Sequence, residues 1–310
     1  MTDNTFFNKI TGFLRPGGSP LRVALEVRPD GIAWAVAPAS PAQRVGFVEC
    51  PPARRAEVLG SLVDEQGWSG ALTDLVLPME QYQVFQMERP AGVDDAELAD
   101  ALKWKLRDLL EFSPSDAISD IFPFPHDAAR GRGELVNVVA ARKSLLKELV
   151  ALVQQSGLKP GRIDIAELAL RNLAARLDPD SKGAALVHLR QNYGQMIICR
   201  GQTLYLSRRL DVSASGLRDA ARQESVVQAL ALEMQRSLDY YESQMGQVPP
   251  AHIRLVAKDR DLPLASMLAS YLAVGVSNLD WTALGLESAI DSRCLPAWSA
   301  GLPLAGEAGK

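Results

Sequence analysis

The chain carries the same order of sequence patterns twice, and this repetition constrains its fold more than any single motif. In each half, apolar runs bounded by turn residues come first, and helical patterns and further apolar runs follow. The runs that open the two halves are residues 21–27, 31–37 and 44–49, and residues 185–189, 195–199 and 204–206. Such runs predict strands. Strands followed by helix and strand, repeated in this order, predict a duplicated α/β architecture with two lobes.

The rest of the chain divides into further helical and extended patterns. Helices are expected at residues 53–65, 94–112, 144–156, 167–177, 226–244 and 263–272. Strands are expected at residues 71–77, 84–88, 117–124, 135–141, 163–165, 253–257 and 273–277. Because the patterns from about residue 82 to 160 interrupt the first half, they predict an inserted α+β subdomain.

Turn-rich segments suggest the boundaries of these parts. We expect an N-terminal segment at 1–18, a first lobe at 19–178, a second lobe at 179–290 and a flexible tail at 291–310. The tail is rich in Gly, Pro and Ala, so we expect it to be dispensable for the fold, although Trp298 could anchor it. The N-terminal segment puts Phe6, Ile10, Phe13 and Leu14 on one helical face, whose role stays open between docking on protein and contact with lipid.

Composition excludes several classes of function. The formal net charge is −4, and a nucleic-acid binder would carry a concentrated basic surface, so we expect no nucleic-acid partner. The Cys and His residues lie far apart and form no metal-binding spacing, so we expect no metal site and no catalytic thiol. These residues are Cys50, Cys199 and Cys294, and His126, His188 and His252.

Two features favour a cytoplasmic protein. The first residues lack the pattern of a signal peptide. The uncharged segment 262–279 contains a proline, a glycine, an asparagine and three serines, so it predicts a short helix and a strand rather than a membrane span.

The helical pattern of residues 94–112 has an apolar stripe and an outlier. Leu98, Leu102, Leu106 and Leu109 share one stripe, and Trp104 falls on the opposite side near Arg107. Two interpretations stay open for Trp104. Another part of the subdomain covers it, or it helps to form a partner-binding groove in which Arg107 orients the bound peptide.

Four stretches in this order resemble a known family: "FSPSDAISDIFPF" (112–124), "GLKPGRIDIAELALRNLAARL" (157–177), "LYLSRRL" (204–210) and "ALEMQRSLDYYESQMGQ" (231–247). They resemble the PilM-like branch of the actin/Hsp70/sugar-kinase superfold, and within it most closely the MshI proteins of mannose-sensitive-haemagglutinin (MSHA) type IV pili. The resemblance covers about residues 21 to 290. It implies a two-lobed actin-like α/β fold with an inserted α+β subdomain in the first lobe.

This resemblance also implies where an ATP cleft would lie and how far it has degenerated. Active relatives place acidic and small residues at the phosphate turns. Here Glu26 keeps a carboxylate, but Arg28 and Pro29 replace small residues, and His188 and Arg190 stand at the acidic and glycine positions of the second turn. Lys258 lies where a glycine pair would admit the adenosine. We therefore expect a pseudo-ATPase without cofactor or catalytic residues. The alternative is that Arg28, Arg190 and Lys258 still bind phosphate.

The resemblance implies a role in binding rather than catalysis. We expect a cytoplasmic scaffold of the MSHA-type pilus assembly platform, held at the inner membrane through its partners. It would bind the cytoplasmic tail of a bitopic inner-membrane protein of the PilN/MshJ type and connect that protein to the pilus assembly ATPase. Two alternatives are a nucleotide-binding switch of the same fold that retains ATP and a polymerising actin-like filament protein.

Overall fold

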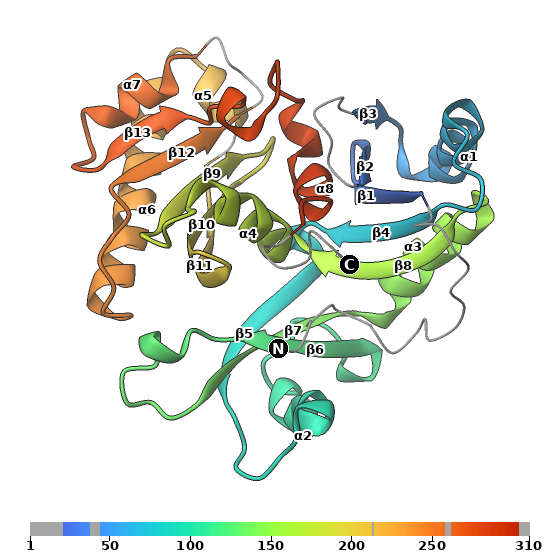
Figure 1. The fold of residues 1–310 in the computed structure, drawn as a ribbon, viewed down its shortest axis with the longest axis horizontal. Helices are drawn as coiled ribbons and strands as arrows, with labels where there is room; N and C mark the ends of the chain where they lie inside the picture. Colours follow the sequence, from blue (N-terminus) through green and yellow to red (C-terminus); the bar gives the residue numbers. More distant parts are fainter. Residues whose placement is uncertain (1–20, 38–43, 213, 258–261, 304–310) are drawn as a thin grey trace. The chain divides into compact units, whose positions relative to one another are not determined.

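The computed structural model describes residues 21–37, 44–212, 214–257 and 262–303 (Figure 1). The described residues form two compact units. Residues 21–37, 44–166 and 296–301 belong to unit 1, and residues 167–295 and 302–303 belong to unit 2. The predicted N-terminal segment, with its apolar face, lies outside the described residues.

Unit 1 is built on a five-stranded sheet in the order β3-β2-β1-β4-β8. Its strands are β1 (Arg22–Arg28), β2 (Gly31–Ala37), β3 (Val45–Glu49), β4 (Leu72–Leu77) and β8 (Lys159–Ile165). The first three strands pair antiparallel, and β1, β4 and β8 pair parallel. The central strands β1 and β4 are buried on both faces, as is usual where strands run parallel.

Two helices of unit 1 accompany this sheet, α1 (Arg55–Gln66) and α3 (Lys143–Gln155). Helix α3 stops where the sequence predicts, because Gly157 adopts a left-handed conformation with φ of 79°. Near α1, the rings of Trp34 and Trp68 meet edge to face with centroids 4.9 Å apart, and Trp68 is fully buried.

The inserted subdomain lies between β4 and β8 in the sequence, as expected. It consists of β5 (Tyr82–Glu88), α2 (Asp95–Leu106), β6 (Ala117–Pro123) and β7 (Leu135–Arg142), and the sheet order is β5-β7-β6. All pairs in this sheet are antiparallel. Helix α2 contributes Leu98, Leu102 and Leu106 to the core of the subdomain.

Helix α2 is shorter than the sequence predicts. It ends at Leu106, and the N–H groups of Leu109 and Leu110 both donate to the Leu106 carbonyl in a tight turn. Leu109 is consequently 50% exposed and is not part of the core stripe. The pattern of leucines continued past the point where the backbone leaves the helix, so periodicity alone overestimated the helix.

Unit 2 repeats the topology of unit 1 with the sheet order β11-β10-β9-β12-β13. Its strands are β9 (Ala184–Leu189), β10 (Gly194–Arg200), β11 (Thr203–Leu210), β12 (His252–Val256) and β13 (Gly275–Asn278). Its helices are α4 (Ala166–Leu177), α5 (Ala214–Arg218), α6 (Gln223–Ser243) and α7 (Leu264–Ala269). In both units an antiparallel meander leads into two parallel strands, which confirms the duplicated architecture.

The boundary between the units falls near the start of α4, whereas the predicted first lobe extends to residue 178. Only Ala166, the first residue of α4, groups with unit 1. Helices at such a boundary carry apolar residues that a sequence pattern cannot assign to one sheet or the other.

The C-terminal segment corrects the prediction of a flexible tail. Residues Ser292–Cys294 form a 3-10 helix, and α8 (Leu295–Ala300) follows directly. Leu295 is fully buried, and Trp298 and Leu302 are 2% and 7% exposed. The spacing of these three residues is that of one helical face, and the Gly, Pro and Ala content around them obscured it. Residues 304–310 of the predicted tail lie outside the described residues.

Candidate functional site

The first predicted phosphate turn joins β1 to β2, and its side chains and backbone contact other residues of unit 1. Glu26 is fully buried, and the side chain of Arg28 is 6% exposed. The Arg28 guanidinium lies 3.9 Å from the Glu26 carboxylate, donates from Nε to Asp30 at 2.9 Å, and stacks over the Phe47 ring at 5.5 Å. The structure thus brings Glu26 and Arg28 together as an ion pair.

The backbone of this turn also has internal partners. The Arg28 carbonyl accepts a hydrogen bond from the Arg55 guanidinium at 2.7 Å, and the Val27 carbonyl accepts one from the Gln81 side-chain amide at 3.2 Å. A phosphate cradle requires free backbone N–H groups, and Pro29 has none to offer. The Val27 and Arg28 carbonyl groups are therefore engaged within unit 1, and Pro29 cannot contribute to a phosphate cradle.

The second predicted phosphate turn joins β9 to β10 and is filled by an aromatic ring. Tyr193 is 3% exposed, and two guanidinium groups flank its ring, those of Arg190 at 5.4 Å and of Arg209 at 4.2 Å from the centroid. The Arg190 N–H donates to the Tyr193 carbonyl at 2.8 Å and closes the turn. Cation–π contacts of this kind stabilise buried cations. Arg190 therefore packs within unit 2.

His188, which stands at the acidic position of the second turn, binds the C-terminal segment. Its ring is 1% exposed, and Nε2 lies 2.8 Å from the Ser292 carbonyl oxygen. A carbonyl oxygen only accepts hydrogen bonds, so Nε2 carries the proton. The imidazole thereby links β9 to the 3-10 helix that precedes α8. Lys258, the remaining residue of the predicted cleft, lies outside the described residues.

The described part of the chain was searched for metal-binding groups and reactive cysteines. No group of three or more His, Cys, Asp or Glu side chains gathers there in a way that could hold a metal ion. The three cysteines are buried and form no disulfide. Burial raises the pKa of the Cys199 thiol to about 12, so at neutral pH this group stays protonated and unreactive.

Helix α2 presents the predicted partner-binding residues to solvent. Trp104 is 69% exposed, so the structure favours an open tryptophan over a covered one. The Lys105 amine lies 5.6 Å from the centre of its ring. Arg107 follows the helix, and its side chain is 71% exposed and pairs with Asp108 at 3.2 Å. Trp104 and Arg107 are three residues apart and share one exposed surface.

Two features of these regions were not predicted from the sequence. Tyr193 was not recognised as the side chain that fills the second turn, although an aromatic residue in a polar turn is a signal that could have suggested it. The pocket of the inserted subdomain combines residues of β6, β7 and the loop between them with Arg89 after β5 and Asp95 of α2, and no sequence spacing indicates it.

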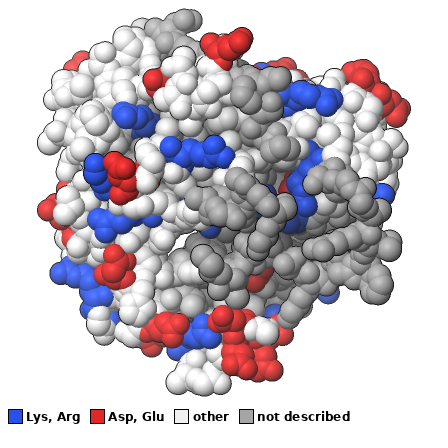
Figure 2. Space-filling view, viewed as in Figure 1, with Lys and Arg blue, Asp and Glu red and all other residues white. Residues whose placement is uncertain are grey.

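On the face drawn in Figure 2, Lys and Arg alternate with Asp and Glu rather than gathering in one basic patch. In the described part of the chain, none of the helices combines the length and the apolar character needed to cross a membrane.

Comparisons with known proteins identify the fold. No protein-family model matches the chain, and no curated protein matches it in sequence. Among solved structures, a chain of the PilM–PilN type IV pilus biogenesis complex matches with a TM-score of 0.69 and 19% identity, over 92% of this chain and 97% of that chain. The cytoplasmic domain of EpsL, an inner-membrane component of the type II secretion system of Vibrio cholerae, matches with a TM-score of 0.52 and 16% identity, over 90% and 93% of the two chains.

The chain has the two-lobed actin-like α/β fold with an inserted α+β subdomain in the first lobe, as the sequence predicts. A protein from Bacteroides thetaiotaomicron that is described as having an actin-like ATPase fold and unknown function also matches, with a TM-score of 0.47 and 10% identity over 86% and 95% of the two chains. At 19% and 16% identity, the likeness to the PilM–PilN and EpsL chains shows the fold alone, and function has to be argued from the site.

Proposed function

We propose that this chain is a non-catalytic scaffold of a type IV pilus assembly platform, of the MSHA type and related to MshI. It binds the cytoplasmic tail of a bitopic inner-membrane protein of the PilN/MshJ type, stays in the cytoplasm at the inner membrane through that partner, and contacts the pilus assembly ATPase. The observation that supports this most is the likeness to PilM from the PilM–PilN complex over more than nine tenths of both chains.

Two observations support binding rather than catalysis. The Arg28 and Arg190 side chains, which would have to meet a nucleotide, are each at most 6% exposed and are engaged within their own units. Metal-assisted phosphoryl transfer further requires carboxylates arranged around Mg²⁺. At the second turn, the imidazole of His188 replaces that carboxylate and binds a backbone carbonyl instead.

The exposed surface of α2 supports a partner site on the inserted subdomain. A tryptophan with 69% of its surface exposed costs free energy in water unless a partner covers it. Tryptophan and arginine are also the residue types that most often dominate interface energetics. Trp104 would supply apolar contact area, and Arg107 would orient the peptide backbone or its carboxylates.

The proposed function is tested by coexpression with a bitopic inner-membrane protein of the PilN/MshJ type. We expect a stable complex in detergent that is lost when the cytoplasmic tail of the membrane protein is deleted. A membrane protein without its tail that still copurifies, or an intact one that does not, would contradict the proposal.

Replacing Trp104 by alanine should separate binding from folding. Because the side chain is exposed, we expect the free energy of unfolding to change by no more than about 0.5 kcal/mol. Binding of the partner tail should weaken by more than about 1 kcal/mol, or roughly fivefold. The measurements are thermal melting and calorimetric titration. Tyr271→Ala, which removes an aromatic ring that is 44% exposed on unit 2, is the control and should leave binding unchanged.

Millimolar ATP with Mg²⁺ should not raise the melting temperature. A ligand at a hundred times its Kd would add about 2.7 kcal/mol of stability, which is easily measured. Inorganic triphosphate with Mg²⁺ is the control for unspecific anion effects. A saturable increase with ATP alone would favour the nucleotide-binding switch over the scaffold without cofactor.

A further inference from the structure

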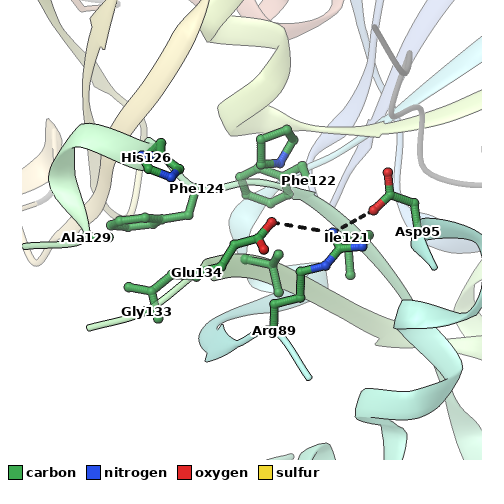
Figure 3. Close-up of a pocket in the computed structure, with 12 residues that line it drawn as sticks. Arg89, Asp95, Ile121, Phe122, Phe124, His126, Ala129, Gly133 and Glu134 are labelled. Atoms are coloured by element: carbon green, nitrogen blue, oxygen red, sulfur yellow. Dashed lines mark ion pairs between the residues drawn. The ribbon is translucent and has the colours of Figure 1, made fainter. Parts of the chain in front are cut away.

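The inserted subdomain contains a pocket of about 180 Å³ at one end of its sheet (Figure 3). Strand β6 ends at this pocket and β7 begins there, and the loop between them closes one side. The inner walls are apolar and largely buried, and they comprise Ile121, Phe122, Phe124, Ala129 and Val136. A dry apolar cavity of about 150 Å³ admits a benzene-sized group. The pocket therefore has room for one leucine or phenylalanine side chain.

Charged groups lie on one side of the same pocket. Arg89 follows β5, and its Nη1 lies 2.6 Å from an Asp95 carboxylate oxygen and 3.7 Å from a Glu134 oxygen. Figure 3 shows Arg89 between these two carboxylates. The Arg89 Nη2 donates to the Val93 carbonyl at 2.9 Å, so the guanidinium ties the start of α2 to the ends of β5 and β7.

Asp95 and Glu134 together carry more negative charge than Arg89 neutralises. At 3.7 Å the Glu134 oxygen is beyond hydrogen-bond distance, and the Glu134 and Asp95 side chains are 63% and 57% exposed. Among the residues that line the pocket, two carboxylates stand against the one guanidinium of Arg89, so the charge balance of the lining is negative. A ligand that fits this arrangement has an apolar group for the interior and an ammonium or guanidinium group for the mouth.

A cytoplasmic tail of the proposed membrane partner would supply cationic side chains. Cytoplasmic segments close to a membrane carry an excess of Lys and Arg. We propose that the pocket binds one apolar side chain of the partner's cytoplasmic tail, with an adjacent Lys or Arg held by Glu134 and Asp95. The identity of the partner in this inference rests on the proposed function. The chemistry of the bound group is inferred from the pocket alone.

The pocket is distinct from the Trp104 surface. Asp95 opens α2 and Trp104 lies nine residues later, which corresponds to about 13 Å along the axis and to opposite sides of the helix. A tail that uses both sites must therefore pass around the end of α2. Loss of one site should weaken the binding of such a tail without abolishing it.

The pocket is tested with small probes in the full-length protein. N-acetyl-phenylalanyl-lysine amide should cause saturable shifts of the methyl NMR signals of Val136 and Ile121, whereas the signal of the buried Val187 in unit 2 should not move. N-acetyl-glycyl-lysine amide should bind more than about tenfold more weakly, because it buries no ring. N-acetyl-phenylalanyl-glutamate amide should bind up to about fivefold more weakly, because the charge interaction is exposed.

Two variants test the roles of charge and space separately. Glu134→Gln should at least halve the preference for the lysine probe over the glutamate probe, and the matched exposed variant Glu148→Gln on α3 should not. Ala129→Leu should fill the pocket and abolish the probe-induced shifts, with an unchanged spectrum elsewhere as the check on folding. Equal binding of the lysine and glutamate probes, equal binding of the phenylalanine and glycine probes, or the absence of shifts at Val136 would overturn the pocket proposal.

These outcomes are independent of the proposed function. Binding of the partner tail that survives both Glu134→Gln and Ala129→Leu unchanged would reject the pocket and leave the scaffold role standing. Selective binding of the lysine probe, with no complex formed with the membrane protein, would support the pocket and reject the scaffold role.

Discussion

Replacing Trp298 by alanine is expected to lower the free energy of unfolding by about 3–5 kcal/mol, the usual cost of truncating a core aromatic side chain. Trp298 is 2% exposed within α8, and Ala297 and Ala300 beside it are equally buried. A smaller side chain would leave a cavity that the surrounding helix and sheet cannot fill without shifting. Deletion of residues 291–310 should be at least as destabilising, because it removes α8 and the carbonyl partner of His188 together.

Trp104→Ala provides the matched control, because it makes the same chemical change at a tryptophan that is 69% exposed. Urea denaturation followed by circular dichroism should separate the two variants by several kcal/mol. Equal stabilities, or a deletion variant that melts like the full chain, would show that the C-terminal segment is dispensable after all.

Replacing Asp74 by alanine should cost about 3 kcal/mol of stability, at the low end of the range for breaking a buried ion pair. Asp74 is 2% exposed in β4. Its carboxylate accepts from Nη1 of Arg22 at 2.8 and 2.9 Å and from the backbone N–H of Arg162 at 3.1 Å. Both arginine side chains are partly exposed and can be rehydrated, which limits the loss.

Asp74 lies at an irregularity in the pairing of β4 with β8. The register of β4 and β8 shifts between Thr73 and Leu75, and the Asp74 carboxylate binds the Arg162 N–H at this irregularity. A Cβ atom at Gly161 would lie 2.5 Å from the Asp74 carboxylate, so Gly161→Ala should also be destabilising.

Chemical denaturation of Asp74→Ala and Gly161→Ala, compared with the exposed control Glu148→Ala on α3, measures these effects. The control should change stability by no more than about 0.5 kcal/mol. If Asp74→Ala and Gly161→Ala each lowered the free energy of unfolding by less than about 1 kcal/mol, other contacts would stabilise the irregularity between β4 and β8.

Much of the architecture was predictable because it follows from local patterns. The hairpin of β1 and β2, the meander of β9 to β11 and the stop of α3 at Gly157 depend on apolar periodicity and turn chemistry, which act over a few residues. The order of these elements then predicts the duplicated fold, since few topologies accommodate a repeated meander with parallel strands.

The candidate sites were predictable only in part. The side chains of the two predicted phosphate turns were named from the sequence, and Trp104 is exposed, which was one of the two interpretations of its position on α2. The filling of the second turn by Tyr193 and Arg209 was not foreseen, because Arg209 comes from a different strand. Contacts between strands depend on register, which single-sequence patterns do not specify.

The sequence by itself determined which segments become strands and helices and that the two halves repeat one topology, because periodicity and turn residues act locally. Only the tertiary structure decided that Trp298 is buried while Trp104 is exposed, that α2 ends at Leu106, and that Arg89 meets Glu134 beside an apolar pocket. Each of these depends on side chains that are distant in sequence and compete for the same space. That competition is resolved only when the whole unit packs.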